Sequence, residues 1–155
     1  TIKMKNEKTI EVLNSLITIN NDRIEGYETA AKETEEHDLK SLFARFILTS
    51  EKCKSELVRE VHMLGGEEAE GTKVSGKFFR VWMDVKSALT GKNRKAILES
   101  CEFGEQEAKE TYENALENNS EYLNAEHHTM IRNQKQLLQE DRNYVKSMVA
   151  TLADS

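Results

Sequence analysis

Residues 65–92 read GGEEAEGTKVSGKFFRVWMDVKSALTGK, and the topology of the predicted helices depends on this connection. Its first half is rich in glycine and glutamate and predicts a loop, because glycine adopts positive φ freely and interrupts helices. Its second half has apolar residues at helical spacing and predicts a short helix over 77–90. A connection of this length can run back along a helix pair, which a tight turn cannot do.

Four long helices are predicted around this connection. Apolar residues recur every three or four positions over 5–34, 39–64, 93–117 and 121–151. The gap within each pair is only a few residues, so each pair forms an antiparallel hairpin. No stretch shows the sustained alternation of a strand. The expected fold is all-α: a single ferritin-like four-helix bundle over 1–155, with two antiparallel hairpins joined by a long crossover that contains a short helix.

The composition supports this fold and excludes several kinds of partner. Charged residues make up 32% of the 155-residue chain, and proline is absent, which favours helices. The net charge of −6 does not suit nucleic-acid binding, which needs a basic face. No apolar run approaches the roughly 18 residues of a membrane helix, and no signal segment opens the chain. Two cysteines are too few for a disulfide framework, so a cytoplasmic protein is expected. The charge and the lack of a long apolar run predict that it has no nucleic-acid or membrane partners.

Glu105 is the clearest polar residue on an interior helix face. It lies seven residues after Leu98 and seven before Tyr112, near the middle of its helix. A buried carboxylate is costly unless it is paired, protonated or bound to a metal. Either a neighbouring lysine or hydroxyl therefore binds it, or it lies at the edge of the interior face, or a metal ion binds it. Other polar residues also fall on interior positions: Asn20, Ser50, Gln134 and Asp141.

A di-metal site is the chemistry that a ferritin-like core can hold. Such a site takes a glutamate from each of two helices and a Glu-x-x-His pair from each of the other two. Lys54 and Asn143 stand where the two histidines are needed, so a di-iron centre and a cofactor are not expected. The alternative is iron or another divalent metal held by carboxylates alone. Its candidate ligands, one from each long helix, are Glu25, Glu51, Glu105 and Glu140.

A second candidate metal site lies at one end of the predicted bundle. His62 is near the end of its helix, and His127 and His128 are near the start of theirs, at the same end. Together with Glu60 or Glu113 they would form a zinc or nickel site. The alternative is three separate histidines at the surface.

Three aromatic residues gather on the predicted short helix: Phe78, Phe79 and Trp82. They either cap the bundle or form the interface of a homodimer through the crossover helix, because aromatic residues concentrate at interface cores.

Several runs of sequence resemble a known family. They are GYETAAKE at 26–33, LF at 42–43, ELVREVHMLGG at 56–66, VWMDVKSALTG at 81–91 and CEFGEQEAKETYENAL at 101–116. Together they resemble an uncharacterised bacterial family of ferritin-like four-helix bundles, catalogued as a domain of unknown function. The resemblance implies the fold and no activity.

The wider relatives that this resemblance implies are rubrerythrins, bacterioferritins and manganese catalases, which share paired Glu-x-x-His motifs. On this sequence, Glu25 and Glu105 match their single-carboxylate positions. Glu51 and Glu140 match only the first member of each pair. The resemblance therefore does not imply ferroxidase, peroxidase or catalase activity.

The function expected from the sequence is that of a non-catalytic structural or interaction protein, with a stress-related role. The alternative is a carboxylate-rich metal-binding protein or weak di-metal oxidoreductase similar to bacterioferritin or rubrerythrin. A binding module for a helix of another protein is the third interpretation.

Overall fold

The computed structural model describes residues 2–71 and 76–153, and the side chains of 3–71 and 83–152. Within these ranges all the regular secondary structure is helical and there is no strand, which confirms the predicted all-α class. The α-helices are α1 (Ile2–Glu33), α2 (His37–Met63), α3 (Gly76–Thr90), α4 (Arg94–Asn118) and α5 (Ala125–Ala153). A short 3-10 helix, η1 (Ser120–Tyr122), precedes α5. None of the helices in the described ranges combines the length and the apolarity that crossing a membrane requires.

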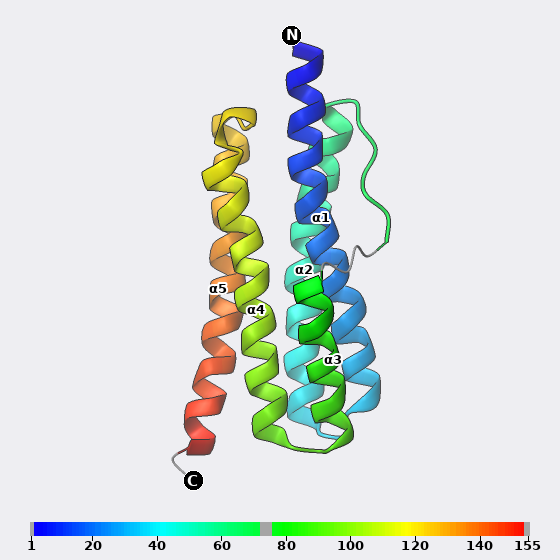
Figure 1. The fold of residues 1–155 in the computed structure, drawn as a ribbon, viewed down its shortest axis with the longest axis vertical. Coiled ribbons are helices and arrows are strands. Elements are labelled where there is room, and N and C mark those ends of the chain that lie inside the picture. The colour runs from blue at the N-terminus through cyan, green and yellow to red at the C-terminus, as the bar shows by residue number, and fades with distance from the viewer. Residues whose placement is uncertain (1, 72–75, 154–155) are drawn as a thin grey trace.

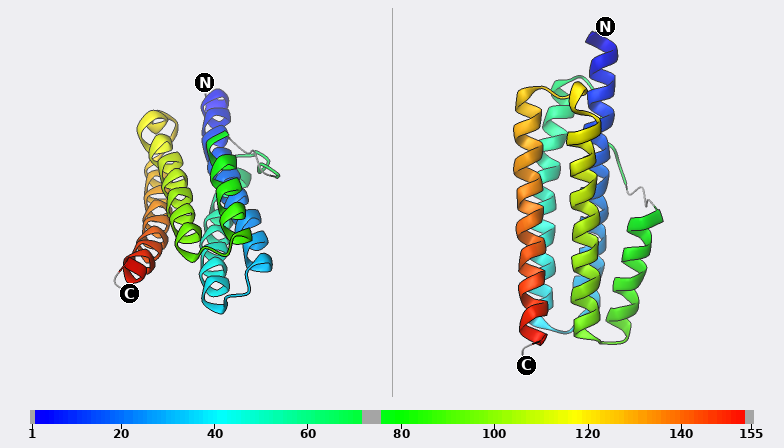
Figure 2. Two further views of the ribbon diagram at one scale, coloured as in Figure 1. Left: turned by 60° about the horizontal axis from the view of Figure 1, so that its bottom comes forward. Right: turned by 60° about the vertical axis from the view of Figure 1, so that its left-hand side comes forward.

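The four long helices lie side by side as two antiparallel hairpins, α1 with α2 and α4 with α5 (Figure 1). After α2 the chain turns back along the outside, and α3 follows in the same downward direction in Figure 1. As a result α2 and α4 run parallel to each other. The right-hand view of Figure 2 places α3 outside the four long helices, next to α4.

Gly65 and Gly66 end α2, as the sequence predicts. The amide of Gly65 donates to the carbonyl of His62 at 3.0 Å, and the amide of Gly66 donates to that of Val61 at 2.9 Å. Gly65 has a φ of +81°, a conformation that other residues adopt at a cost.

The last helix begins later than the sequence predicts, at Ala125 and not at 121. The residues before it form η1, and Asn124 then caps α5. The Asn124 side chain accepts a hydrogen bond from the amide of His127 at 2.8 Å, while the His127 ring accepts one from the amide of Asn124 at 3.2 Å. This reciprocal pair satisfies amides that a helix start otherwise leaves without partners.

The hydrophobic core consists of two clusters at different heights along the long helices. One cluster surrounds Leu16, Leu57 and Ile131. The other surrounds Phe43, Phe46 and Leu98. Polar side chains from all four long helices are buried as well, among them Arg23, Ser50, Glu105 and Asp141.

Two asparagines of α1 hold the start of the crossover. Asn14 donates to the carbonyl of Glu67 at 3.0 Å and accepts from the amide of Ala69 at 2.8 Å. Asn21 donates to the carbonyl of Gly71 at 3.0 Å. The crossover is therefore fixed against α1 before α3 begins.

Candidate functional site

A charged layer crosses the middle of the core. Each of the four long helices supplies one buried side chain to it: Arg23 from α1, Ser50 from α2, Glu105 from α4 and Asp141 from α5. None of the four is more than 2% exposed. We call these four residues the charged layer.

Arg23 is the centre of the charged layer. Its Nη2 atom lies 2.6 Å from Oε1 of Glu105 and 3.3 Å from Oδ2 of Asp141, and its Nη1 donates to the hydroxyl of Ser50. Its guanidinium carbon lies 5.7 Å from the ring centroids of both Tyr27 and Phe46. One cation thus binds both carboxylates and also rests against two aromatic rings, which further stabilises its charge.

A second arginine connects the layer to the surface. The Nε of Arg45, on α2, donates to Oδ1 of Asp141 at 3.0 Å. The Arg45 side chain is 44% exposed, and its guanidinium stacks on Tyr144 with 4.6 Å between the charged carbon and the ring centroid. Arg23 and Arg45 therefore balance the two carboxylates of Glu105 and Asp141, so the charged layer together with Arg45 carries no formal net charge.

The electrostatics of the layer follow from burial and from the ion pair. Burial raises the pKa of Glu105, and the neighbouring Arg23 acts in the opposite direction. Burial by itself would lower the pKa of Arg23, but the Glu105 carboxylate holds that pKa above its ordinary value. Burial, followed by the charge of Glu105, raises the pKa of Tyr27 well above its usual range. Tyr27 therefore stays protonated and donates to Oε1 of Glu105 at 2.9 Å.

Part of the hydrogen-bonding capacity of the layer is unused. Oε2 of Glu105 and Nε of Arg23 are both buried and have no hydrogen-bond partner among the described residues. Such groups cost stability, because their interaction with water is lost without replacement.

A second polar chain crosses the core next to the charged layer. The amide of Asn20 donates to the Tyr112 hydroxyl at 2.8 Å, and that hydroxyl donates to Oε1 of Gln134 at 2.7 Å. The Gln134 amide then donates to the carbonyl of Cys53 at 3.2 Å and to Glu56 at 2.9 Å. This chain also joins all four long helices, and it has no formal charge until it reaches Glu56 near the surface.

Both cysteines, Cys53 and Cys101, are buried. Burial raises the pKa of Cys53 to about 11 and raises the pKa of Cys101 as well. Thiols of this kind are protonated at neutral pH and are poor nucleophiles, so neither residue has the features of a redox centre.

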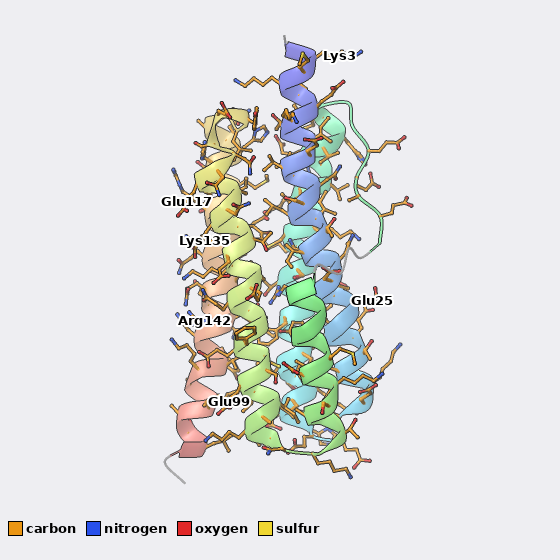
Figure 3. The ribbon with its side chains drawn as sticks, in the orientation of Figure 1. Lys3, Glu25, Glu99, Glu117, Lys135 and Arg142 are labelled. Atoms are coloured by element: carbon orange, nitrogen blue, oxygen red, sulfur yellow. The ribbon has the colours of Figure 1, made fainter. Side chains whose placement is uncertain are left out.

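The four glutamates predicted as metal ligands are not brought together. Only Glu105 is buried, whereas Glu25, Glu51 and Glu140 are exposed. Figure 3 shows Glu25 on the outer side of α1, away from α4 and α5. The partner of Glu105 is Arg23, and Tyr27 is the hydroxyl beside it.

The three histidines at the end of the helices have separate partners. His62 contacts Glu68, Nε2 of His127 lies 3.0 Å from Oε1 of Glu60, and Nε2 of His128 lies 3.2 Å from the Ser120 hydroxyl. Within the described residues, no three His, Cys, Asp or Glu side chains gather as a metal site would require. The aromatic side chains of Phe78, Phe79 and Trp82 lie outside the described residues.

The residues of the charged layer do not fit the di-iron centre of a ferritin-like core. Such a centre needs carboxylates and imidazoles that face a pair of cations. In the charged layer no imidazole is present, and a guanidinium lies between the two carboxylates. A metal ion there would meet the fixed positive charge of Arg23 at close range.

Arg23 is the functional residue that the sequence reasoning missed. The spacing of residues along this helix identifies Arg23 as an interior residue. Alternating intervals of four and three residues connect Leu16, Asn20, Arg23, Tyr27 and Ala30. All five are buried. Ile24 and Ala31, each one residue further along than Arg23 and Ala30, are only partly buried.

The fold and the charged layer define an all-helical protein with an ion-paired core. Residues 8–118 match the family described as a domain of unknown function, DUF2383, and the chain belongs to this family. No curated protein matches the sequence.

Proposed function

We propose that this protein is a ferritin-like four-helix bundle in which Arg23 takes the place of the central metal ions. It acts as a non-catalytic structural or interaction protein in the bacterial cytoplasm, with a stress-related role. The observation that supports this proposal is the binding of both buried carboxylates by one buried guanidinium, at 2.6 and 3.3 Å. An arginine in this position gives the charge balance that a metal would otherwise provide, and it has no redox chemistry.

The order of the helices supports the ferritin-like part of the proposal. A long crossover between two hairpins makes the second and third long helices parallel, which is the arrangement of ferritin-like bundles. Here α2 and α4 are parallel, and 12 residues separate Met63 from Gly76, the first residue of α3 (Figure 1).

Metal analysis tests the proposal directly. The protein is produced in iron-supplemented medium, purified without chelator, and analysed for bound metals. Ferrous iron is then added in air, and the absorbance of an oxo-bridged iron pair is followed. We expect far less than one metal per chain and no such absorbance. Two irons per chain would overturn the proposal in favour of a carboxylate-rich metal-binding protein or oxidoreductase.

A pair of variants tests the role of Arg23. Arg23→Gln removes the cation between the two carboxylates, and we expect it to increase the affinity for a divalent cation such as Mn²⁺. Arg45→Gln is the matched control, because Arg45 binds the same Asp141 from the exposed side. Equal Mn²⁺ binding by the wild type and both variants, with folding verified by circular dichroism, would contradict this role.

A further inference from the structure

A groove lies beside α1 and includes Asp22, the residue that precedes Arg23. It has a volume of about 690 Å³ and is formed by α1, by the start of the crossover and by Thr111 of α4. The crossover segment that borders it is the one that Asn14 and Asn21 hold against α1. Figure 1 shows the crossover descending beside α1 at this level.

Asp22 is the buried charged residue of this groove. It is 5% exposed, and its Oδ1 atom is buried without a hydrogen-bond partner among the described residues. Asp22 is among the residues that line the groove, and of its two carboxylate oxygens only Oδ1 is a buried atom without a partner, so the other is the oxygen through which a ligand would bind. A buried carboxylate without a donor is unfavourable, and a cationic ligand in the groove would supply that donor.

The charge of the groove has one sign. Glu11, Asp22 and Glu70 line it, and among the residues that the structure describes no lysine or arginine does. The groove between α2 and α5, by comparison, includes both Lys52 and Arg59. The Asp22 groove therefore selects for cations.

The spacing of the acids indicates the shape of the ligand. Glu11 and Asp22 are eleven residues apart on one helix, which corresponds to about 16 Å along its axis. Three complete turns of helix separate them, so they share a face. Within the described residues no three acidic, histidine or cysteine side chains are close enough to hold a metal ion. An extended ligand with separated positive charges fits this arrangement better than a single ion does.

We propose that this groove binds a linear aliphatic polyamine. One ammonium group binds Asp22, with Thr18 and Glu70 beside it, and a second lies toward Glu11. The methylene segments of the ligand pack along the apolar wall of Ile10 and Ile19.

Calorimetry with spermidine tests the proposal. We expect Asp22→Asn to weaken binding about tenfold, because it replaces a charge-assisted hydrogen bond with a neutral one. Glu28→Gln is the matched control, since it removes one negative charge from an exposed position of the same helix. Thr18→Val, in the groove wall, is a second test variant, and we expect it to weaken binding by a smaller factor.

Three outcomes are distinguished. Weaker binding by Asp22→Asn together with unchanged binding by Glu28→Gln supports the site. Equal losses in both variants would mean attraction to the acidic surface as a whole and would overturn it. Mg²⁺ that displaces spermidine at equal concentration would overturn it too, because the groove would then respond to charge alone. Circular dichroism of each variant verifies the fold.

The pH dependence of binding adds an independent test. Burial, and then the charge of Glu25, raises the pKa of Asp22 to about 7. The other charged groups at the groove are Glu11 on α1 and Glu70 on the crossover, whereas α4 contributes the neutral Thr111. Wild-type affinity should therefore rise between about pH 6 and pH 8, as Asp22 loses its proton. A flat profile that matches Asp22→Asn would contradict the proposal.

Discussion

The guanidinium of Arg23 places a full positive charge in the core, and Glu105 is its nearest counterion at 2.6 Å. When one member of a buried ion pair is removed, the other is left as an uncompensated charge in a medium that solvates it poorly. Asp141 cannot replace Glu105 fully, because it lies farther from Arg23, at 3.3 Å, and also binds Arg45.

Glu105→Leu is therefore expected to lower the free energy of unfolding by about 3–5 kcal/mol, the usual cost of breaking a buried ion pair. The double variant Arg23→Met, Glu105→Leu removes both charges and should lose clearly less than the sum of the two single losses. Urea unfolding of the four proteins in this cycle measures the coupling. Additive losses would show that the two side chains do not depend on each other.

Asp22 gives a stability prediction whose sign follows from its pKa. Burial raises that pKa from 3.8 to about 7, so the folded protein holds the proton more tightly than the unfolded chain does. Stability therefore falls as the pH rises from about 4 to about 7 and is then constant. The full shift corresponds to about 4 kcal/mol, and we expect about 2 kcal/mol because the groove admits solvent.

The measurement is urea unfolding of the wild type and of Asp22→Asn at several pH values. Relative to the wild type, the variant should gain stability across this range, because asparagine has no charge to bury. Glu28→Gln, on the exposed side of α1, should follow the wild type. A constant difference between Asp22→Asn and the wild type from pH 4 to 8 would contradict the prediction.

The interior polar residues could be predicted from spacing, but their partners could not. Glu105, Ser50 and Asp141 fall in phase with apolar residues of their own helices, and all three are buried. The partner of Glu105 is 82 residues away in the sequence. Which residue it meets depends on how the two hairpins are rotated against each other, and periodicity within one helix has no information about that rotation.

Among the helices, the sequence signals that mark where a helix begins or ends differ in strength. The pair Gly65–Gly66 is easily recognised, and α2 ends just before it. The start of α5 depends instead on Asn124, whose capping bond to His127 competes with continuation of the helix from residue 121. Periodicity extends across such a cap and cannot locate it.

The crossover is the element whose position rests on few contacts, so it is where a single substitution should have a local effect. Asn14→Ala removes a hydrogen bond to the carbonyl of Glu67 and one from the amide of Ala69. We expect faster cleavage by a glutamate-specific protease after Glu67, Glu68 or Glu70, and faster hydrogen exchange at the Ala69 amide. The global stability should fall by only about 1–2 kcal/mol.

Asn133→Ala is the matched control for this experiment, because Asn133 is an exposed asparagine of α5 far from the crossover in sequence. It should leave both the cleavage rate and the exchange rate unchanged. If Asn14→Ala changes neither rate, the crossover is held by other contacts.

At the scale of the whole molecule, contacts within each hairpin are much more extensive than contacts between them. The charged layer and the Tyr112 chain supply specific bonds across that interface. Arg23 joins α1 to α4, and Arg45 joins α2 to α5. A purely apolar interface would allow several rotations of one hairpin against the other, whereas these directional bonds favour one.

We predict that the whole molecule self-associates through α3. The helix lies outside the four long helices (Figure 2), and Met83, one turn beyond Phe79, is 51% exposed. We expect light scattering after size exclusion to give a mass of about 36 kDa, twice that of the 17.8-kDa chain. Trp82→Ala should shift the protein toward the monomer, because aromatic residues contribute strongly at interface centres. Leu48→Ala is the control, since Leu48 is a large apolar residue of α2 that is 66% exposed. A wild-type monomer at high concentration would mean that the aromatic residues of α3 pack against the protein itself.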